Sequence, residues 1–484
     1  MLSTTFLGHQ GWLFQSKSSS FLVDPLLCEE FGHAQALEYR VYPPRVFNFE
    51  CFPKIDGVVL THEHDDHFDV PSLARLDRAI PIFLSSRSSV AARQILKEMG
   101  FTVHPLLPGQ KLQFGDLELT PFCGDHVRVN SGDEWDTLPF FVRHLGGSGN
   151  FFSMVDITLT EQQIQWARAR DSRPVVMTWT NNALDWSHMT DFLESKNATK
   201  ECFIKMGVDH KLITSGWGTP AAILMCAGGF TFYGDRAWLN HRVFCVDNAA
   251  VCQQMSRLYP KEQFHVARPG QTFLMEGHRL KRVLDDTPFL TTAPPETWPA
   301  RGPVRDKNET TAIVDYAPAT GRREMENGDN ELLERRLQDF AGSLVGGTIF
   351  KGLHSLLHDQ ATGRIPTFAL ALRDGSAGER RVYEYVPSDC AFVRGKANPE
   401  ETYLAGMECW GTDLLAILGG DLGPIALNFG RARLWNALPD RFFFDLFAEF
   451  HRVSHPLRRP AEYLRTYQRL LAKCANAAPT IFHR

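Results

Sequence analysis

The ten cysteines of this 484-residue chain include no Cys-x-x-Cys pair. This absence argues against a zinc ribbon, and it favours reduced thiols over a framework of disulfides. The paired Cys-x-His and Cys-x-x-His elements of a Rieske centre are missing too, so the sequence predicts no iron–sulfur cluster. Chemistry that depends on paired cysteines is therefore excluded.

Long apolar runs and basic blocks are also absent. No stretch approaches the roughly 20 uncharged apolar residues that cross a bilayer, and the N-terminus lacks the charged and apolar regions of a signal peptide. Lys and Arg number 51 against 56 Asp and Glu, without the basic clusters that bind nucleic acid. We therefore expect a cytoplasmic protein without a membrane span or a nucleic-acid partner, acting on a small molecule.

The most informative segment that is present follows the apolar run Gly57–Leu60. It reads Thr-His-Glu-His-Asp-Asp-His and holds four side chains that can bind a metal, namely His62, His64, Asp66 and His67. Residues two apart on an extended strand end point the same way, so His62 and His64 can bind one ion together. The turn that follows lets Asp66 and His67 face a second ion. A histidine-rich surface loop would explain one or two of these residues, but it explains the ordered set poorly.

This motif resembles the metal signature of the metallo-β-lactamase fold superfamily. The segments Phe6–Gly11 and Phe21–Pro25 are similar to the opening hairpin of its lactonase and phospholipase branch. His9 and Asp24 lie in this hairpin, and we expect Asp24 to support a ligand or to occupy a turn. The resemblance covers roughly residues 1–250.

The resemblance also implies a fold and further ligands. The implied fold is α/β, an αββα sandwich, and the different pattern of the C-terminal sequence predicts a second, smaller α+β domain after it. His126 falls where the family places the third histidine of the first site, and Asp156 where it places the carboxylate that bridges both ions.

One position departs from the family pattern. The family closes its second site with a histidine at a strand end, whereas Met225–Phe230 has Ala227 or Gly228 at that place. We predict that His241 completes the second site or that a position there stays open to water; tight binding of only one metal is the remaining alternative. His210, Asp235 and the more distant His188 are the other candidates.

The proline-rich segment that begins at Thr291 predicts a linker. We therefore expect a catalytic domain over residues 1–290, a linker over 291–325 and an α+β accessory domain over 326–484. The periodicity predicts helices over Asn330–Leu344, Thr402–Gly420, Arg441–Phe450 and Ala461–Ala475, and strands over Thr367–Leu372 and Arg381–Val386. The segment Tyr403–Gly420 faintly resembles sterol-carrier-like modules and the tails of proteins related to CMP-N-acetylneuraminate hydroxylase. An ordinary accessory or homodimerisation domain is the alternative.

Two classes of chemistry fit the predicted site. Two divalent ions about 3.5–4 Å apart can lower the pKa of a shared water, and the metal-bridging hydroxide can hydrolyse an ester, lactone, amide or phosphodiester. Asp66 would orient that hydroxide or bind the second ion. The same ligands also suit iron, and the alternative is therefore a non-haem di-iron oxygenase that hydroxylates its substrate. Zinc, iron and manganese all remain open as the two ions. A binding protein that holds metal without catalysis is the third and least favoured class.

Overall fold

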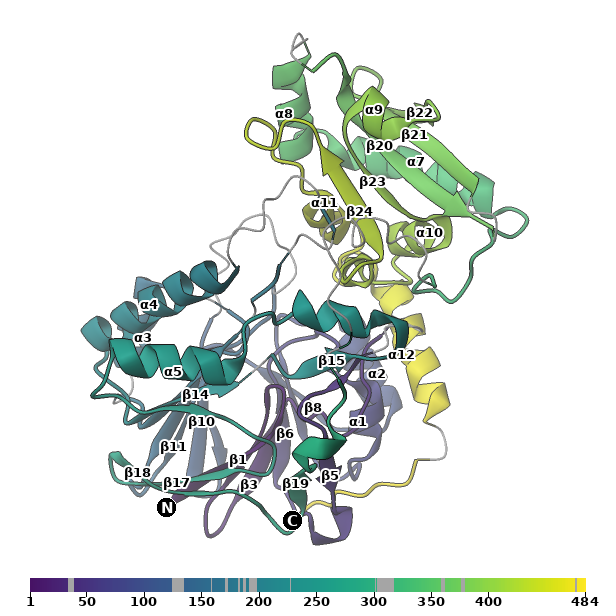
Figure 1. Cartoon of the computed structure of the whole chain (residues 1–484). Coiled ribbons are helices and arrows are strands. Elements are labelled where there is room, and N and C mark those ends of the chain that lie inside the picture. Colours follow the sequence, from purple (N-terminus) through teal and green to yellow (C-terminus); the bar gives the residue numbers. More distant parts are fainter. Residues whose placement is uncertain are drawn as a thin grey trace.

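The structure, a computed structural model, describes residues 1–33, 39–123, 135–157, 159–169, 173–181, 183–185, 189–190, 198–226, 228–300, 302, 317–357, 362–375, 379–474 and 477–484. Two large sheets form its first half (Figure 1). The eight-stranded sheet has the order β18-β17-β1-β2-β3-β6-β7-β8. Its strands are β1 (Leu2–Gly8), β2 (Gly11–Gln15), β3 (Ser20–Val23), β6 (Gly57–Leu60), β7 (Ile82–Ser85), β8 (Val103–Leu106), β17 (Thr272–Glu276) and β18 (Arg279–Leu284).

The second large sheet has seven strands in the order β16-β14-β13-β12-β11-β10-β9. They are β9 (Leu112–Phe114), β10 (Leu117–Pro121), β11 (Phe140–His144), β12 (Asn150–Ser153), β13 (Val176–Thr180), β14 (Ala222–Cys226) and β16 (Phe264–Val266). Two small pairs lie beside the large sheets, β4 (Tyr39–Val41) with β15 (Phe230–Phe232) and β5 (Arg45–Phe47) with β19 (Leu290–Thr292).

Alternation along the strands decides how the layers pack. In β2 and β3 the aromatic residues Phe14 and Phe21 face the second sheet and contribute to the core between the sheets. Their neighbours Leu13 and Leu22 face the opposite way and contribute to a separate core beneath helices. Because successive side chains of a strand point to opposite faces, an apolar run of this kind belongs to a sheet covered on both sides.

Helices cover both outer faces. The first sheet carries α1 (Val70–Ala74) and α2 (Val90–Glu98), and the second carries α3 (Glu161–Arg168), α4 (Ala198–Gly216) and α5 (Asn248–Leu258). Ser89 caps α2 by accepting a hydrogen bond from the Ala92 amide, and Thr160 forms a capping box with Gln163 at α3. The expected αββα sandwich is thus confirmed.

The C-terminal part has a sheet of its own, with five strands in the order β22-β21-β20-β23-β24. The strands are β20 (Ile365–Asp374), β21 (Glu379–Val386), β22 (Ala391–Arg394), β23 (Tyr403–Trp410) and β24 (Ala432–Asn436). The helices are α7 (Asp329–Leu344), α8 (Thr348–Leu356), α9 (Pro399–Thr402), α10 (Gly411–Gly419), α11 (Leu446–Val453) and α12 (Pro460–Lys473). Short 3₁₀ helices are η1 (Phe49–Cys51), η4 (Gly234–His241), η5 (Pro295–Thr297) and η6 (Pro424–Leu427).

The prediction of one helix over Thr402–Gly420 was wrong in its first half. Tyr403–Trp410 forms β23, a strand between β20 and β24 whose residues are all buried, and only Gly411–Gly419 is helical. A continuously apolar segment that is buried on both faces has no period of two, so the pattern alone does not distinguish it from a buried helix. The helix expected over Arg441–Phe450 begins only at Leu446, after the N-cap Asp445.

The last helix returns to the first half of the chain. In Figure 1, α12 runs down beside α1 and α2, and the buried residues Tyr467 and Leu470 join the core under those helices. After α12, Ile481 forms a bridge with Leu76. The predicted boundaries of the domains, 1–290, 291–325 and 326–484, stay a prediction. The structure adds that the final segment contributes to the core of the N-terminal sandwich.

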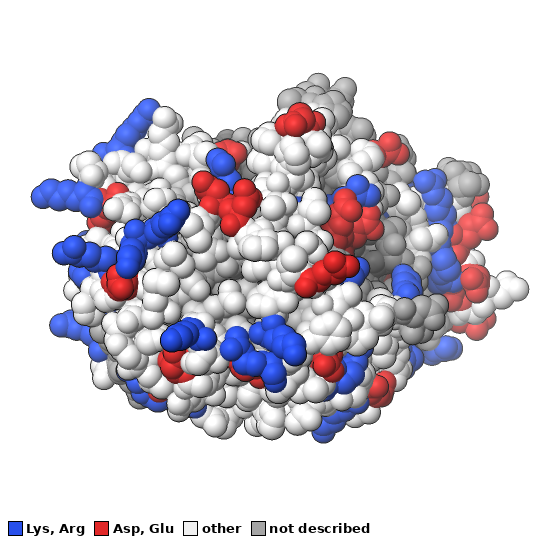
Figure 2. All heavy atoms as spheres, turned by 90° about the horizontal axis from the view of Figure 1, so that it is seen from below, with Lys and Arg blue, Asp and Glu red and all other residues white. Residues whose placement is uncertain are grey.

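The surface agrees with the balanced composition. On the face seen in Figure 2, basic and acidic side chains are interspersed and leave wide uncharged areas between them. No helix in the described part of the chain is both long and apolar enough to cross a membrane.

Candidate metal centre

The predicted ligands His62 and Asp156, and the expected supporting residue Asp24, follow the ends of three strands. Asp24 follows β3, His62 follows β6 by two residues, and Asp156 follows β12 by three. Because β3 and β6 are parallel neighbours, their carboxyl ends meet at one edge of the first sheet. The backbone is left-handed at or next to two of these residues, because Asp24 has a φ of 44° and Val155, which precedes Asp156, has a φ of 53°. Left-handed backbone at residues other than glycine is uncommon and occurs often at functional sites.

Three overlapping groups of side chains have ligand atoms close enough to share an ion. Within each group these atoms lie within 4.8 Å of one another. The groups are His62, His64 and Asp156; Asp24, His62 and His67; and His9, Asp66 and His67. Asp156 Oδ2 lies 2.8 Å from His67 Nε2 and 3.7 Å from His62 Nε2. One oxygen of the Asp156 carboxylate thus faces both His62 and His67, as a ligand that bridges two ions would.

A second layer of hydrogen bonds sets the tautomers of two histidines. Asp24 accepts hydrogen bonds from the Thr61 amide at 2.8 Å, the Thr61 hydroxyl at 2.5 Å and His67 Nδ1 at 2.8 Å. Since the hydroxyl proton of Thr61 goes to Asp24, its oxygen accepts from His62 Nδ1, 3.0 Å away. Both histidines thus carry a proton on Nδ1, which frees Nε2 to bind metal.

The buried Nε2 of His62 tests whether the site fits a metal. His62 is completely buried, and its Nε2 has no hydrogen-bond partner among the described residues. A buried polar atom is rarely left without a partner, and an unpartnered one calls for a bound ion or water. Imidazole and carboxylate groups are the donors that zinc, iron and manganese accept. The residues present therefore fit a metal centre.

The electrostatics of the cluster also suit cations. Burial alone would lower the pKa of His67, but three carboxylates, led by Asp66, raise it well above the ordinary value. Burial and the neighbouring His67 and His64 hold the pKa of His62 well below that value. Burial acts to raise the pKa of Asp66, yet His67 and His9 lower it well below its usual range. A metal that replaces the His67 proton would meet ionised carboxylates, so binding should release a proton.

The support that Asp24 gives to His67 leads to a first prediction. Asp24→Asn keeps the shape of the side chain but removes the charge that orients His67. We expect the affinity for metal to fall about 10- to 100-fold, because partners of this kind fix the orientation and basicity of a ligand. Titration with zinc against a competing chelator measures the change.

A matched control is available outside the cluster. His210 Nε2 lies 2.6 Å from Glu262, which forms a second buried histidine–carboxylate pair. Glu262→Gln should leave the affinity for metal unchanged. Equal affinities of Asp24→Asn and the wild type would show that Asp24 does not support a ligand.

The remaining predicted ligands and candidates have different outcomes. His126 and His188 lie outside the described residues. The structure does not bring His241 to the cluster, which corrects that prediction. It ends η4, and its Nε2 lies 3.0 Å from the carbonyl oxygen of Gly302. Among the other candidates, His210 pairs with Glu262 as above, and Asp235 belongs to none of the described groups.

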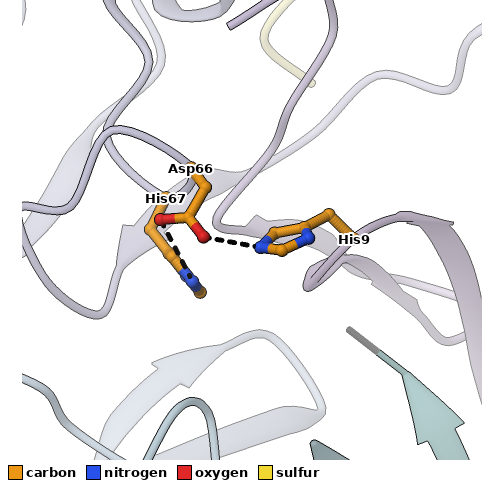
Figure 3. Close-up of side chains that lie close together, drawn as sticks. All are labelled: His9, Asp66 and His67. Carbon is orange, nitrogen blue, oxygen red and sulfur yellow. Dashed lines mark hydrogen bonds and ion pairs between the residues drawn. The ribbon is translucent and has the colours of Figure 1, made fainter. Parts of the chain in front are cut away.

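The sequence analysis did not assign His9 to the metal site. This residue lies in the turn between β1 and β2, is buried, and places Nε2 2.7 Å from Asp66 Oδ2. Figure 3 shows Asp66 between His9 and His67, with its two oxygens turned toward them. A histidine between Gly8 and Gly11 in a tight turn was the available signal, since glycines permit close approach of a backbone to a site.

A pocket opens over this cluster between the two halves of the chain. It has a volume of about 250 Å³, and His9, His64, Asp66 and Asp156 form part of its lining. Its opposite wall comes from the C-terminal part and comprises Gly420–Ala426, Phe429, His451, His455 and Pro456. Phe31, Phe230 and Phe244 add an aromatic side. No lysine or arginine lies among its described lining residues.

Comparison with known proteins agrees with this picture. Residues 20–214 match the family described as "Beta-lactamase superfamily domain". A curated relative, the 4-amino-L-phenylalanyl-(CmlP-peptidyl-carrier-protein) 3-hydroxylase of Streptomyces venezuelae, is 30% identical over 142 residues, which is 27% of this chain and 25% of the relative. The chain thus spans about a quarter of the length of this relative.

Two solved structures extend the comparison. CmlA, a di-iron β-hydroxylase from Streptomyces venezuelae, is 14% identical with a TM-score of 0.37, over 58% of this chain and 54% of that one. An isothiocyanate hydrolase from Delia radicum gut bacteria is 16% identical with a TM-score of 0.39, over 57% of this chain and 99% of that one. The layers of the N-terminal part are those of the metallo-β-lactamase fold, residues 20–214 match the superfamily domain, and the ligand motif gives this part a candidate metal site.

Proposed function

We propose that the chain is a dinuclear metallo-hydrolase that cleaves an ester, lactone or amide with an apolar body. The observation that carries this proposal is the buried cluster with Asp156 between His62 and His67. Bound at this cluster, two divalent ions would supply a water of lowered pKa and polarise the oxygen of the scissile group.

Hydrogen bonds orient the side chains that would bind the two ions. Asp24 fixes His67, and Thr61 fixes His62, so both present Nε2 to the same carboxylate of Asp156. Gln10 donates to Asp156 Oδ1 at 3.3 Å and to Thr180 Oγ1 at 2.9 Å, which restrains the second oxygen of that carboxylate. Positions held in this way need no rearrangement when the substrate reacts.

The pocket bears on the class of substrate. Its described lining combines phenylalanines with acidic groups and histidines and contains no lysine or arginine. A polyanionic substrate such as a nucleic acid relies on basic side chains along its backbone. Apolar walls with few polar groups are typical of sites for small, largely apolar ligands. The pocket therefore supports an acyl ester, lactone or amide better than a phosphodiester.

Hydrolysis and oxygenation differ in the reactants they consume, because hydrolysis needs only water. Water supplies a hydroxyl to the acyl carbon and a proton to the leaving oxygen or nitrogen as the bond between them breaks. The second candidate is the oxygenase, and the activity of the curated relative, a 3-hydroxylase, favours it. Hydroxylation would take one oxygen atom from dioxygen and release the other as water, with two electrons from an external reductant.

Oxygen dependence provides the test. The purified protein is offered a chromogenic aryl acyl ester, an acyl lactone and an aryl phosphodiester, in air and under argon. We expect the ester or lactone to turn over at equal rates in both atmospheres, with one ¹⁸O atom from labelled water in the acid product.

The opposite result is equally well defined. Failure to hydrolyse these probes, together with reductant-dependent uptake of dioxygen by the protein loaded with iron, would reject the hydrolase in favour of the oxygenase. The phosphodiester serves as the comparison for substrate class, and a preference for it would contradict the apolar substrate.

A further inference from the structure

The segment that follows β14 lacks the family's last histidine, and its glycine packs against another histidine instead. A Cβ atom at Gly229 would lie 2.7 Å from His9 Cα, 3.1 Å from its amide nitrogen and 3.1 Å from its Nδ1. Carbon atoms do not approach this closely, so any larger residue at position 229 would displace His9. The absence of a side chain here is therefore what allows His9 to occupy this place.

His9 is held by its turn in an uncommon conformation. Its φ is 54° and that of Gly8 is 110°, so the chain reverses direction in left-handed backbone between β1 and β2. The Phe31 and Phe230 rings lie 6.0 Å from the His9 ring, and the ring is buried. Strained backbone persists only where the surroundings determine it, and such positions cluster at functional sites.

The ligand atoms of the group in Figure 3 lie close enough together to share one ion. His9 Nε2 is 2.7 Å from Asp66 Oδ2, and His67 Nε2 is 3.9 Å from Asp66 Oδ1. Ligand atoms bound at about 2 Å around one ion lie roughly 3 Å apart. All three ligand atoms of the group lie within 4.8 Å of one another. Asp66 is then the residue that both histidines flank.

We propose that His9 is a ligand of the second ion, with Asp66, His67 and the bridging Asp156, and that it replaces the histidine which this family carries after β14. This inference rests on the dinuclear site proposed above and assigns the ligand that the motif residues leave open. It gives Asp66 the role of a ligand. His9 lies in the N-terminal hairpin, far along the chain from the segment after β14 where the family carries its histidine.

A simpler role for His9 would be to position Asp66 by a hydrogen bond. Two variants separate these roles. His9→Ala removes both functions, whereas His9→Gln can still donate a hydrogen bond to Asp66 from its amide but is a poor metal ligand. His241→Ala is the matched control, because that histidine lies outside the cluster.

The measurement is a chelator titration of zinc-loaded full-length protein, with the metal content determined at each step. The wild type should lose two ions in two steps, and His241→Ala should behave alike. His9→Ala and His9→Gln should both bind the second ion at least about 100-fold more weakly, while the first ion stays bound and the thermal transition of the folded protein persists.

Each result is decisive for His9. Retention of both ions with unchanged affinity in His9→Ala, or full rescue by His9→Gln, would overturn the ligand assignment and leave the hydrolase proposal intact. A wild type that binds fewer than two ions would overturn both. A wild type that binds two ions but needs dioxygen for turnover would reject the hydrolase alone.

Discussion

Replacing His62 by alanine is expected to abolish turnover while the fold survives. The rate should fall on the order of 1,000-fold or more, which corresponds to about 4 kcal/mol of lost transition-state stabilisation. The physical reason is that His62 Nε2 is buried without a partner among the described residues and is held ready by Thr61. Metal content should fall by one ion per chain, and kcat should fall with it.

The control for this variant is a histidine of similar burial. His210 is 5% exposed against 0% for His62, but it pairs with Glu262 away from the cluster. His210→Ala should keep both ions and full activity, although it loses some stability. Full activity of His62→Ala, measured alongside an intact metal content, would refute the assignment of the first site.

The second large effect is expected from Asp156→Asn. Asp156 Oδ2 faces both His62 and His67, so its carboxylate contributes to both halves of the cluster. The amide keeps the shape of the side chain but loses the negative charge that two cations share. We therefore expect both ions to bind more weakly, whereas the His9 variants weaken only one.

Metal titration and activity together measure this prediction. Asp156→Asn should show losses in both chelator steps and a fall in kcat on the order of 1,000-fold, as for His62→Ala. A variant that loses one ion only, and keeps the other at wild-type affinity, would show that Asp156 does not bridge.

Much of the N-terminal half could be predicted from local pattern. The motif at His62–His67 follows a short apolar strand, and the structure places all four of its candidate ligands in the described groups. The resemblance of this motif to the metallo-β-lactamase fold implied the sandwich, and the alternation of short apolar runs with helices fits it, because each strand carries buried residues on both faces. Local spacing determines these features, so the sequence reveals them directly.

The features that were missed depend on contacts between distant parts of the chain. His9 precedes Asp66 by 57 residues, and only the tertiary fold brings the two together. The position of His241 is likewise set by η4 and its contact with Gly302, not by its distance along the chain from β14. Proximity in sequence suggested His241, which the fold places outside the described groups, whereas the hairpin between β1 and β2 brings His9 against Gly229 in the segment after β14.

The C-terminal part illustrates the same limit. Tyr467, in the last helix, donates a hydrogen bond to Glu63 Oε1 at 2.8 Å, and Glu63 lies in the sequence between the predicted ligands His62 and His64. Glu63 is held as well by the amide and hydroxyl of Ser89. The C-terminal part therefore contacts the metal motif through Tyr467, and it also forms one wall of the pocket. No local pattern in α12 indicates this contact.

The metal content of anaerobically purified protein tests the central claim most directly. The two-ion cluster predicts two divalent ions per chain, removed by a chelator in two separable steps. Zinc or manganese at that level, with turnover independent of air, would agree with hydrolysis. Protein that binds no ion at His62, His64, Asp66, His67 and Asp156 when offered zinc, iron or manganese would contradict the account.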